Sequence, residues 1–311
     1  MANKFINDHF LNKFKASAHQ MKKFLLFFVV TTTLASCNFR NQKQDENEKP
    51  VVTVSIIPLK TFVEEIAGDD FTIQVLVPQG ASPETYSLLP SQLKQISQSK
   101  AWFRLGFLEF ELALWQKLQQ MNRNMKVVDL SKNLNLIVGK EIKHGDHVHL
   151  EGVDPHTWMS PKLVKIMAGQ IVSTLSELNE ENQVTYQANY EKFINEIDEL
   201  DAKIEKALAD YKGRTFVAFH PSLSYFARDY GLVQYPLELD GKEPTTQHMI
   251  EVVDIARREK IKAIFIQNEF DIDHAKVFAE EINGEIVEIK PLDAEWNENI
   301  WNLTQLLIEN F

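Results

Sequence analysis

The stretch that decides the fold is EENQVTYQANYEKFINEIDELDAKIEKALADY, residues 180–211. It contains neither glycine nor proline, and its apolar side chains recur every three or four residues, as on one face of an α-helix. About 30 residues with a rise of 1.5 Å each would span roughly 45 Å, which is longer than one small lobe requires. We therefore expect a helix that joins two lobes, although a core helix of a single domain is the alternative.

Alternating strand and helix patterns lie on both sides of this helix. The sequence predicts an α/β fold with two lobes, each a parallel sheet flanked by helices, because β-branched runs alternate with amphipathic segments. Before the helix, strands are expected at 51–57, 71–77, 101–105 and 126–129. After it, strands are expected at 215–219, 261–267 and 285–289, and helices at 246–259 and 296–309. The expected organisation is an N-terminal lobe at 51–179, the linking helix at 180–211 and a C-terminal lobe at 212–311.

The N-terminal segment has the features of an export signal. Two lysines precede a short apolar run that ends in Leu-Ala-Ser-Cys at residues 34–37, and this run resembles the signal and lipobox of bacterial lipoproteins. We expect residues 1–36 to be a signal region with the true start at Met21, Cys37 to be acylated, and residues 37–50 to form the anchor and a polar stalk. Two or three acyl chains hold a protein firmly on a membrane. A free structural cysteine behind a cleaved signal is the alternative.

Composition limits the possible partners and metal ligands. Hydrophobic residues make up 44% of the chain and charged residues 25%, as in an ordinary globular protein. The net charge of −11 argues against nucleic acid and favours cations near the surface. Because Cys37 is the only cysteine, thiolate metal sites are excluded from the mature body. Any metal must be held by histidine, aspartate, glutamate or water.

Four polar side chains lie at the ends of predicted strands or in loops, where the ligand sites of α/β sheets gather. Glu84 lies in a loop behind a proline, and Glu269 comes just after the strand at 261–267. His156 lies between two prolines, and Asp154 is positioned to orient its ring. His220 ends the strand at 215–219, and we expect it to be neutral because the positive end of a helix dipole disfavours an imidazolium. For each residue taken alone, a surface carboxylate or a merely hydrogen-bonded histidine is the alternative.

A further cluster precedes this segment: His144, His147 and His149, with Asp146 between them. Short histidine-rich tracts are weakly prone to bind metal. Because the segment contains Gly145, we expect a flexible loop that collects metal loosely. A cluster without function is the alternative.

The segments together resemble the metal-binding solute receptors of bacterial ABC importers, of the cluster A-I or zinc/manganese type. The resemblance rests on three motifs and their order: Asp-Pro-His-Thr-Trp at 154–158, Phe-His-Pro at 219–221 followed by Tyr-Phe at 225–226, and Lys-Glu-Pro-Thr at 242–245. It covers nearly all of residues 51–311. It implies two lobes joined by one rigid helix, with the metal in a cleft between them. It also implies that the receptor captures the metal outside the cytoplasm and delivers it to a permease driven by an ATPase.

The sequence departs from the family pattern at three positions. Glu84 stands where the family has a histidine, Lys290 where it often has an acidic ligand, and Gln267 where a glutamate is usual. His156 and His220 match family ligands, so we expect a site of Glu84, His156 and His220, with Glu269 as the fourth ligand. Lys290 is expected to lie beside the ligands, paired with Glu269 or Glu84, in which case water would be the fourth ligand.

The resemblance and the ligand types favour zinc over manganese. Two imidazoles with carboxylates suit tetrahedral zinc, manganese tolerates the same set, and histidine loops in the family accompany zinc. We expect a monomeric, lipid-anchored receptor in the cell envelope or periplasm, and not an enzyme or a nucleic-acid-binding protein. The alternatives are a metal-dependent hydrolase, for which no HExxH or Ser-His-Asp signature is present, a surface adhesin with a metal site, and a receptor for chelated iron.

Overall fold

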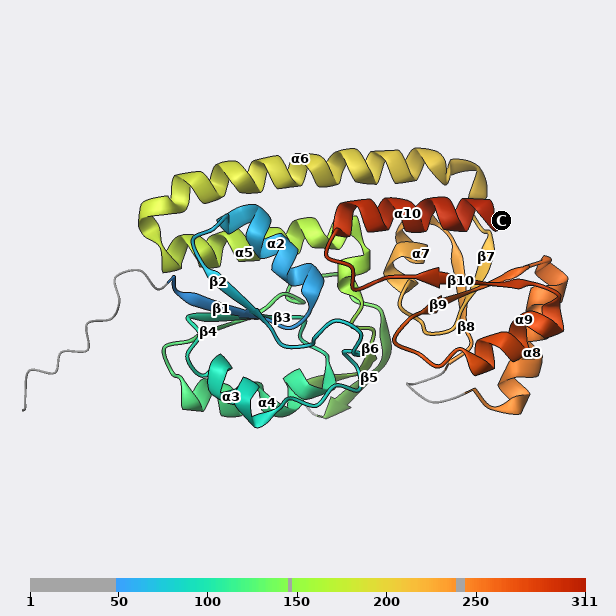
Figure 1. Cartoon of the computed structure of the whole chain (residues 1–311), viewed down its shortest axis with the longest axis horizontal. Coiled ribbons are helices and arrows are strands. Elements are labelled where there is room, and N and C mark those ends of the chain that lie inside the picture. The colour runs from blue at the N-terminus through green and yellow to red at the C-terminus, as the bar shows by residue number, and fades with distance from the viewer. Residues whose placement is uncertain (1–48, 145–146, 239–243) are drawn as a thin grey trace, which may run out of the picture. The chain divides into compact units, whose positions relative to one another are not determined.

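The computed structural model describes residues 49–144, 147–238 and 244–311, and between residues 140 and 151 it describes the backbone alone. Residues 49–311 form one compact unit (Figure 1). The predicted signal region, Cys37 and most of the stalk lie outside the described residues. Within those described, no helix combines the length and the apolar character needed to cross a bilayer.

The first lobe is built on a four-stranded sheet in which every pair is parallel. The strand order is β2-β1-β3-β4, and the strands are β1 (Val51–Val54), β2 (Thr72–Val75), β3 (Ala101–Arg104) and β4 (Lys126–Asp129). Strand β3 is buried along its whole length, as expected for a parallel strand covered by helices on both faces. Its helices are α2 (Ile57–Ala67), α3 (Pro90–Ile96), α4 (Glu109–Met121) and α5 (Pro161–Leu178).

The second lobe repeats this topology. Its parallel sheet has the order β10-β9-β7-β8, with β7 (Thr215–Ala218), β8 (Val233–Pro236), β9 (Ala263–Gln267) and β10 (Glu285–Ile289). Its helices are α7 (Ser224–Tyr230), α8 (Thr246–Glu259), α9 (Asp273–Ile282) and α10 (Trp296–Glu309). In each sheet the first and third strands of the lobe lie side by side, β1 beside β3 and β7 beside β9. The strand order changes direction between these two strands, so each lobe has a switch point where ligands commonly bind.

The long helix α6 (Gln183–Ala207) runs along both lobes, as Figure 1 shows. One turn of 3₁₀ helix precedes it at Glu180–Asn182 and another follows it at Ala209–Tyr211. The predicted helix is therefore present, but its α-helical part is shorter than the expected range of 180–211. In the first lobe, the Tyr186 hydroxyl donates to Asp70 at 2.6 Å. At the other end, Asp201 accepts a hydrogen bond from Tyr230 of α7. The helix is therefore fixed to both lobes.

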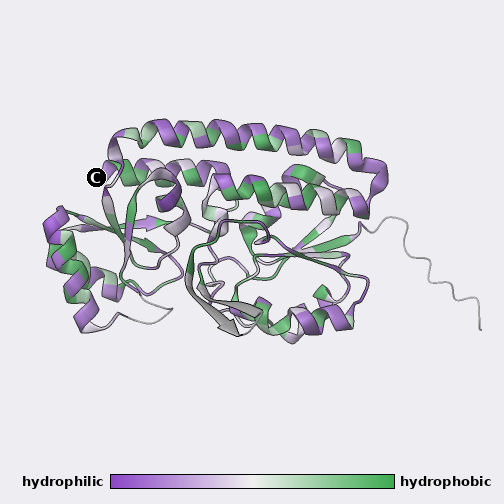
Figure 2. Cartoon of the chain, turned by 180° about the vertical axis from the view of Figure 1, so that it is seen from behind, coloured by the Kyte–Doolittle hydropathy of each residue, from purple (hydrophilic) through white to green (hydrophobic). Residues whose placement is uncertain are grey.

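The apolar core is continuous between the lobes. One cluster extends from strands β1 and β3 through helices α5 and α6 to one face of the second sheet, and a smaller cluster fills the other face of that sheet. Trp296, at the start of α10, packs edge-on against Phe62 of α2 in the first lobe. The C-terminal segment thus returns to contact the first lobe. Figure 2 shows that helix α6 is striped with hydrophilic residues along its length.

The histidine-rich segment forms a hairpin, so the prediction of a loop is wrong, while its role in binding metal stays a prediction. Strands β5 (Val138–His144) and β6 (His147–Val153) pair antiparallel, with His144 opposite His147. Residues 145–146 and the side chains of His144, His147 and His149 lie outside what the structure describes. The alternation of valine, isoleucine and leucine with polar residues is typical of a hairpin, and the glycine indicated its turn.

Candidate metal centre

His156 is held in one orientation by the chain around it. It precedes a short 3₁₀ turn (Thr157–Met159), and Ser160 then caps α5 by accepting a hydrogen bond from the Leu163 amide. Asp154 accepts hydrogen bonds from the His156 backbone N–H at 2.9 Å and from its ring Nδ1 at 2.8 Å. Burial raises the pKa of Asp154, but the adjacent imidazole outweighs that effect and lowers it. Since Nδ1 donates to a carboxylate, Nε2 carries the free lone pair of the neutral ring.

The second lobe supports the same loop from the other side. Tyr225 of α7 donates its hydroxyl hydrogen to the Asp154 carbonyl at 2.7 Å. The indole N–H of Trp158, whose ring lies beside that of His156, donates to the Pro291 carbonyl at 2.8 Å. His156 therefore belongs to the first lobe in sequence but is positioned by both.

His220 follows β7, and its ring is held by a residue that the sequence analysis missed. Its Nδ1 lies 2.7 Å from Oε2 of Glu238, a buried carboxylate just past β8. Backbone pairing between β7 and β8 continues past the ends of both strands, where the Glu238 N–H donates to the Phe219 carbonyl at 2.7 Å. The ring of Phe270 stacks on the imidazole, with centroids 4.7 Å apart. A carboxylate on Nδ1 again directs Nε2 to the site.

The charge of His220 differs from the expectation. Burial lowers the pKa of His220, but its hydrogen bonds to Glu238 and Glu84 outweigh burial and raise the pKa to about 9. The ring is therefore protonated at neutral pH while no cation is bound. The prediction of a neutral imidazole failed because α7 begins only at Ser224, so the helix dipole acts from a distance, whereas two carboxylates contact the ring.

Glu84 completes a tight group with the two histidines. Its Oε1 lies 3.3 Å from Nε2 of His156 and 3.1 Å from Nε2 of His220, and the two nitrogens are 3.3 Å apart. Burial raises the pKa of Glu84, but the hydrogen bond with His220 and the charges of both imidazoles more than offset this and lower it. Among the described residues, these three form the group of His, Asp and Glu side chains close enough to hold a metal.

The donor triangle has the dimensions that zinc requires. A tetrahedral zinc ion with bonds of about 2.0–2.1 Å has neighbouring ligand atoms about 3.3–3.4 Å apart. The three separations in the structure, 3.1, 3.3 and 3.3 Å, are close to this value without any rearrangement. Two imidazole nitrogens and one carboxylate oxygen, each ring supported by a second carboxylate, are therefore chemically and geometrically suited to a zinc-like cation.

The triad borders two spaces. On one side is a cavity of 20 Å³, lined by Ser82, Pro83, Glu84, His156, Trp158, His220, Gln267, Glu269, Phe270, Pro291 and Leu292. On the other is a more open pocket of 440 Å³, whose lining includes the same three side chains together with Glu109 and the end of the hairpin at Gly152 and Val153. An ion could enter through the larger pocket, and the smaller cavity has room for one small ligand.

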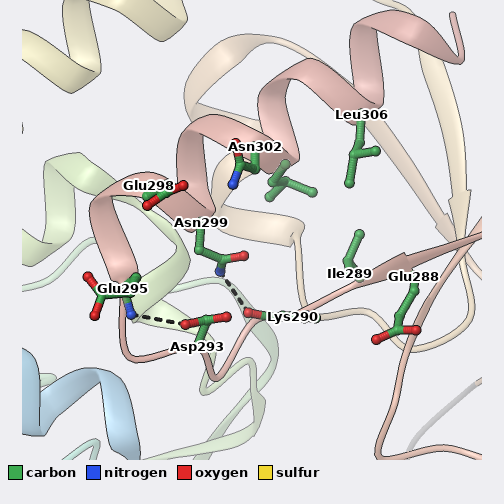
Figure 3. A pocket seen from close by; sticks show the side chains of 10 residues that line it. Glu288, Ile289, Lys290, Asp293, Glu295, Glu298, Asn299, Asn302 and Leu306 are labelled. Carbon is green, nitrogen blue, oxygen red and sulfur yellow. Dashed lines mark hydrogen bonds between the residues drawn. The ribbon is translucent and has the colours of Figure 1, made fainter.

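Two predicted site residues lie differently from the expectation. Glu269 lines the small cavity, but it is not part of the close group formed by Glu84 and the histidines. Lys290 is exposed and lines a separate pocket at α10, where its carbonyl accepts a hydrogen bond from the Asn299 amide at 2.7 Å (Figure 3). No ion pair of Lys290 with Glu84 or Glu269 is found among the residues described. Instead, its neighbours Pro291 and Leu292 line the small cavity.

Fold and site together define a two-lobed α/β binding protein with a candidate cation site between imidazoles from different lobes. The chain belongs to the ZnuA family, described as the periplasmic component A of a zinc-uptake complex, whose family model matches residues 52–310. The chain is therefore a binding protein of a transport system and not an enzyme, as predicted.

Individual relatives agree with this assignment. A crystal structure of ZnuA is 34% identical, with a TM-score of 0.78, over 85% of this chain and 99% of that one. The zinc-binding lipoprotein AdcA of Streptococcus pneumoniae R6 is 24% identical over 90% of this chain, which spans 57% of AdcA. The periplasmic zinc-binding protein TroA of Treponema pallidum, 19% identical with a TM-score of 0.72 over 84% of this chain and 99% of that one, shares the fold.

Proposed function

We propose that this chain is an extracytoplasmic receptor that captures a divalent metal ion, zinc in preference to manganese, and delivers it to the permease and ATPase of an ABC importer. The observation that carries the proposal is the triangle of Nε2 of His156, Nε2 of His220 and Oε1 of Glu84, with sides of 3.1–3.3 Å. Two nitrogens and one oxygen favour zinc, since manganese prefers sites richer in oxygen. Membership of the ZnuA family supports the transport role.

The remaining parts of the proposal rest on sequence. Cys37 would carry the lipid anchor, and residues 38–50 would be a stalk. The lobes would be residues 51–179 and 212–311, joined by 180–211, with the reservation that residues 291–296 contact the first lobe. Glu269 would reach the metal only by a shift of its side chain. Asp154 and Glu238 would orient the two imidazoles.

The direct test is calorimetric titration of zinc into the chain lacking residues 1–37, since residues 49–311 form a compact unit. We expect one tight zinc ion per chain and weaker binding of manganese. A zinc titration that reveals no tight site, or a clearly higher affinity for manganese than for zinc, would contradict the proposal.

The carboxylate at position 84 allows a sharper test. Glu84→Gln keeps the shape of the side chain but removes its negative charge, so zinc affinity should fall by more than about 100-fold, the upper range for losing an outer-shell partner. Glu199→Gln, on the exposed face of α6, is the matched control and should leave the affinity unchanged. An unchanged dissociation constant for Glu84→Gln would remove Glu84 from the ligand set.

The hairpin is expected to act separately from the triad. Replacing His144, His147 and His149 with asparagine should reduce weak additional zinc binding while the tight site keeps its affinity. The reason is that Glu84, His156 and His220 already bring three ligand atoms together. Loss of the tight site in this triple variant, measured by the same titration, would show that the hairpin supplies a ligand.

A further inference from the structure

Gln267 is a buried polar residue in the small cavity that the proposed ligand set does not use. It is the last residue of β9, next to β7 at the switch point of the second sheet, and its side chain is 6% exposed. It lines the same cavity as Glu84, His156 and His220. Its Oε1 has no hydrogen-bond partner among the described residues.

A buried amide oxygen without a partner is unusual, because nearly all buried polar atoms are hydrogen-bonded to protein or to ordered water. The adjoining cavity of 20 Å³ exceeds the roughly 10–15 Å³ that one water molecule needs. It is too small for more than a water-sized occupant. Gln267 and the triad therefore line one space that can hold a single water-sized molecule.

We infer that Gln267 positions a water molecule as the fourth ligand of the bound metal, with Oε1 accepting a hydrogen bond from that water. This inference rests on the proposed function and deepens it. Three protein donors leave one position of a tetrahedral ion open, and the cavity borders all three of them. Water bound to a dication is a strong hydrogen-bond donor, which suits a neutral amide oxygen.

The inference gives Gln267 a role in metal selectivity. With an amide at this position, Glu84 is the one carboxylate in the close group, and the site remains rich in nitrogen. A carboxylate at position 267 would add a hard, charged oxygen beside the metal, which favours manganese. Gln267 is thus a positioning residue that keeps the site suited to zinc.

Two variants and a neighbouring control test this role. Gln267→Met is similar in size but cannot accept the hydrogen bond, so zinc affinity should fall about 10- to 100-fold. The melting temperature of the metal-free protein should not fall, because the oxygen removed has no protein partner. Gln267→Glu should raise the affinity for manganese relative to zinc. Asn268→Met, at the exposed next residue, should change neither quantity.

The outcomes separate the possible roles. Wild-type zinc affinity in Gln267→Met would overturn the inference, and if Glu269→Gln then lost affinity, Glu269 would be the fourth ligand. A lowered melting temperature of metal-free Gln267→Met would assign Gln267 a structural role instead. If the wild-type protein binds no zinc at all, the proposed function fails and the inference falls with it, whereas wild-type binding with an unaffected Gln267→Met refutes the inference alone.

Discussion

Replacing His156 and His220 together with alanine is expected to abolish tight zinc binding. Each ring supplies one Nε2 to the donor triangle, and loss of a direct ligand should exceed the 10- to 100-fold effect of losing an outer-shell partner. The double variant should therefore lose more than about 100-fold in affinity, although the two losses do not simply add because the rings are in contact. Calorimetric titration of zinc into the double variant should then show no tight site.

His248→Ala is the matched control for this variant. His248 is a half-buried histidine of α8 whose Nε2 lies 3.0 Å from the Pro236 carbonyl oxygen, and it does not belong to the triad. Its replacement should leave the zinc affinity unchanged. Zinc at 100 times the dissociation constant should also stabilise the wild type by about 2.7 kcal/mol and so raise its melting temperature, and it should not stabilise the double variant. Equal zinc affinity in the double variant and the wild type would refute the site.

Local sequence patterns predicted most elements of the fold well. Helix α8 was expected at the residues where it occurs, since Thr245 caps it by accepting a hydrogen bond from the His248 amide. Strand β10 and helix α10 also match their expected ranges. The hairpin β5–β6 and strand β8 were not predicted: histidine and charged residues accompany the apolar residues of β5 and β6, and β8 is only four residues long and ends in proline. Such strands depend on pairing with a neighbour more than on their own composition.

The two imidazoles could be predicted because each follows a strand or precedes a helix and is flanked by proline. Glu238 could not be found in this way, since its role depends on β8 pairing with β7, which no local pattern specifies. Once that pairing is known, Glu238 lies opposite the end of β7 and next to His220. Both the burial of Glu238 and its place just past a strand are visible only in the structure.

Lys290 illustrates a different limit of sequence reasoning. The resemblance to the family placed it beside the ligands, but successive side chains at the end of a strand point to opposite sides. Ile289, the last residue of β10, is buried, whereas Lys290 is exposed on the side of α10. The expected repulsion between its ammonium group and the metal is therefore removed by orientation and does not require a carboxylate between them.

Zinc affinity should depend steeply on pH because a proton and the metal compete for His220. The pKa of His220 is about 9 in the metal-free protein, and metal binding requires the unprotonated ring. Between pH 6 and pH 9 the apparent affinity should rise about tenfold per pH unit, or roughly a thousandfold in total, and become flat above pH 9. At pH 7.5 each zinc should release about one proton from this ring, which titrations in buffers of different ionisation enthalpy would measure.

Glu238→Gln provides the discriminating comparison, because it removes the carboxylate that holds the proton on Nδ1 of His220. The pKa of His220 should fall towards its ordinary value, so the pH dependence moves to lower pH and proton release at pH 7.5 decreases. Affinity at pH 9 should nevertheless fall about 10- to 100-fold, since the ring loses the partner that orients it. In the metal-free wild type, the raised pKa stabilises the folded state below pH 6.5, and this stabilisation is lost as the pH rises through 9. Zinc binding without proton release at pH 7.5 in the wild type would show that His220 is not the protonated ligand.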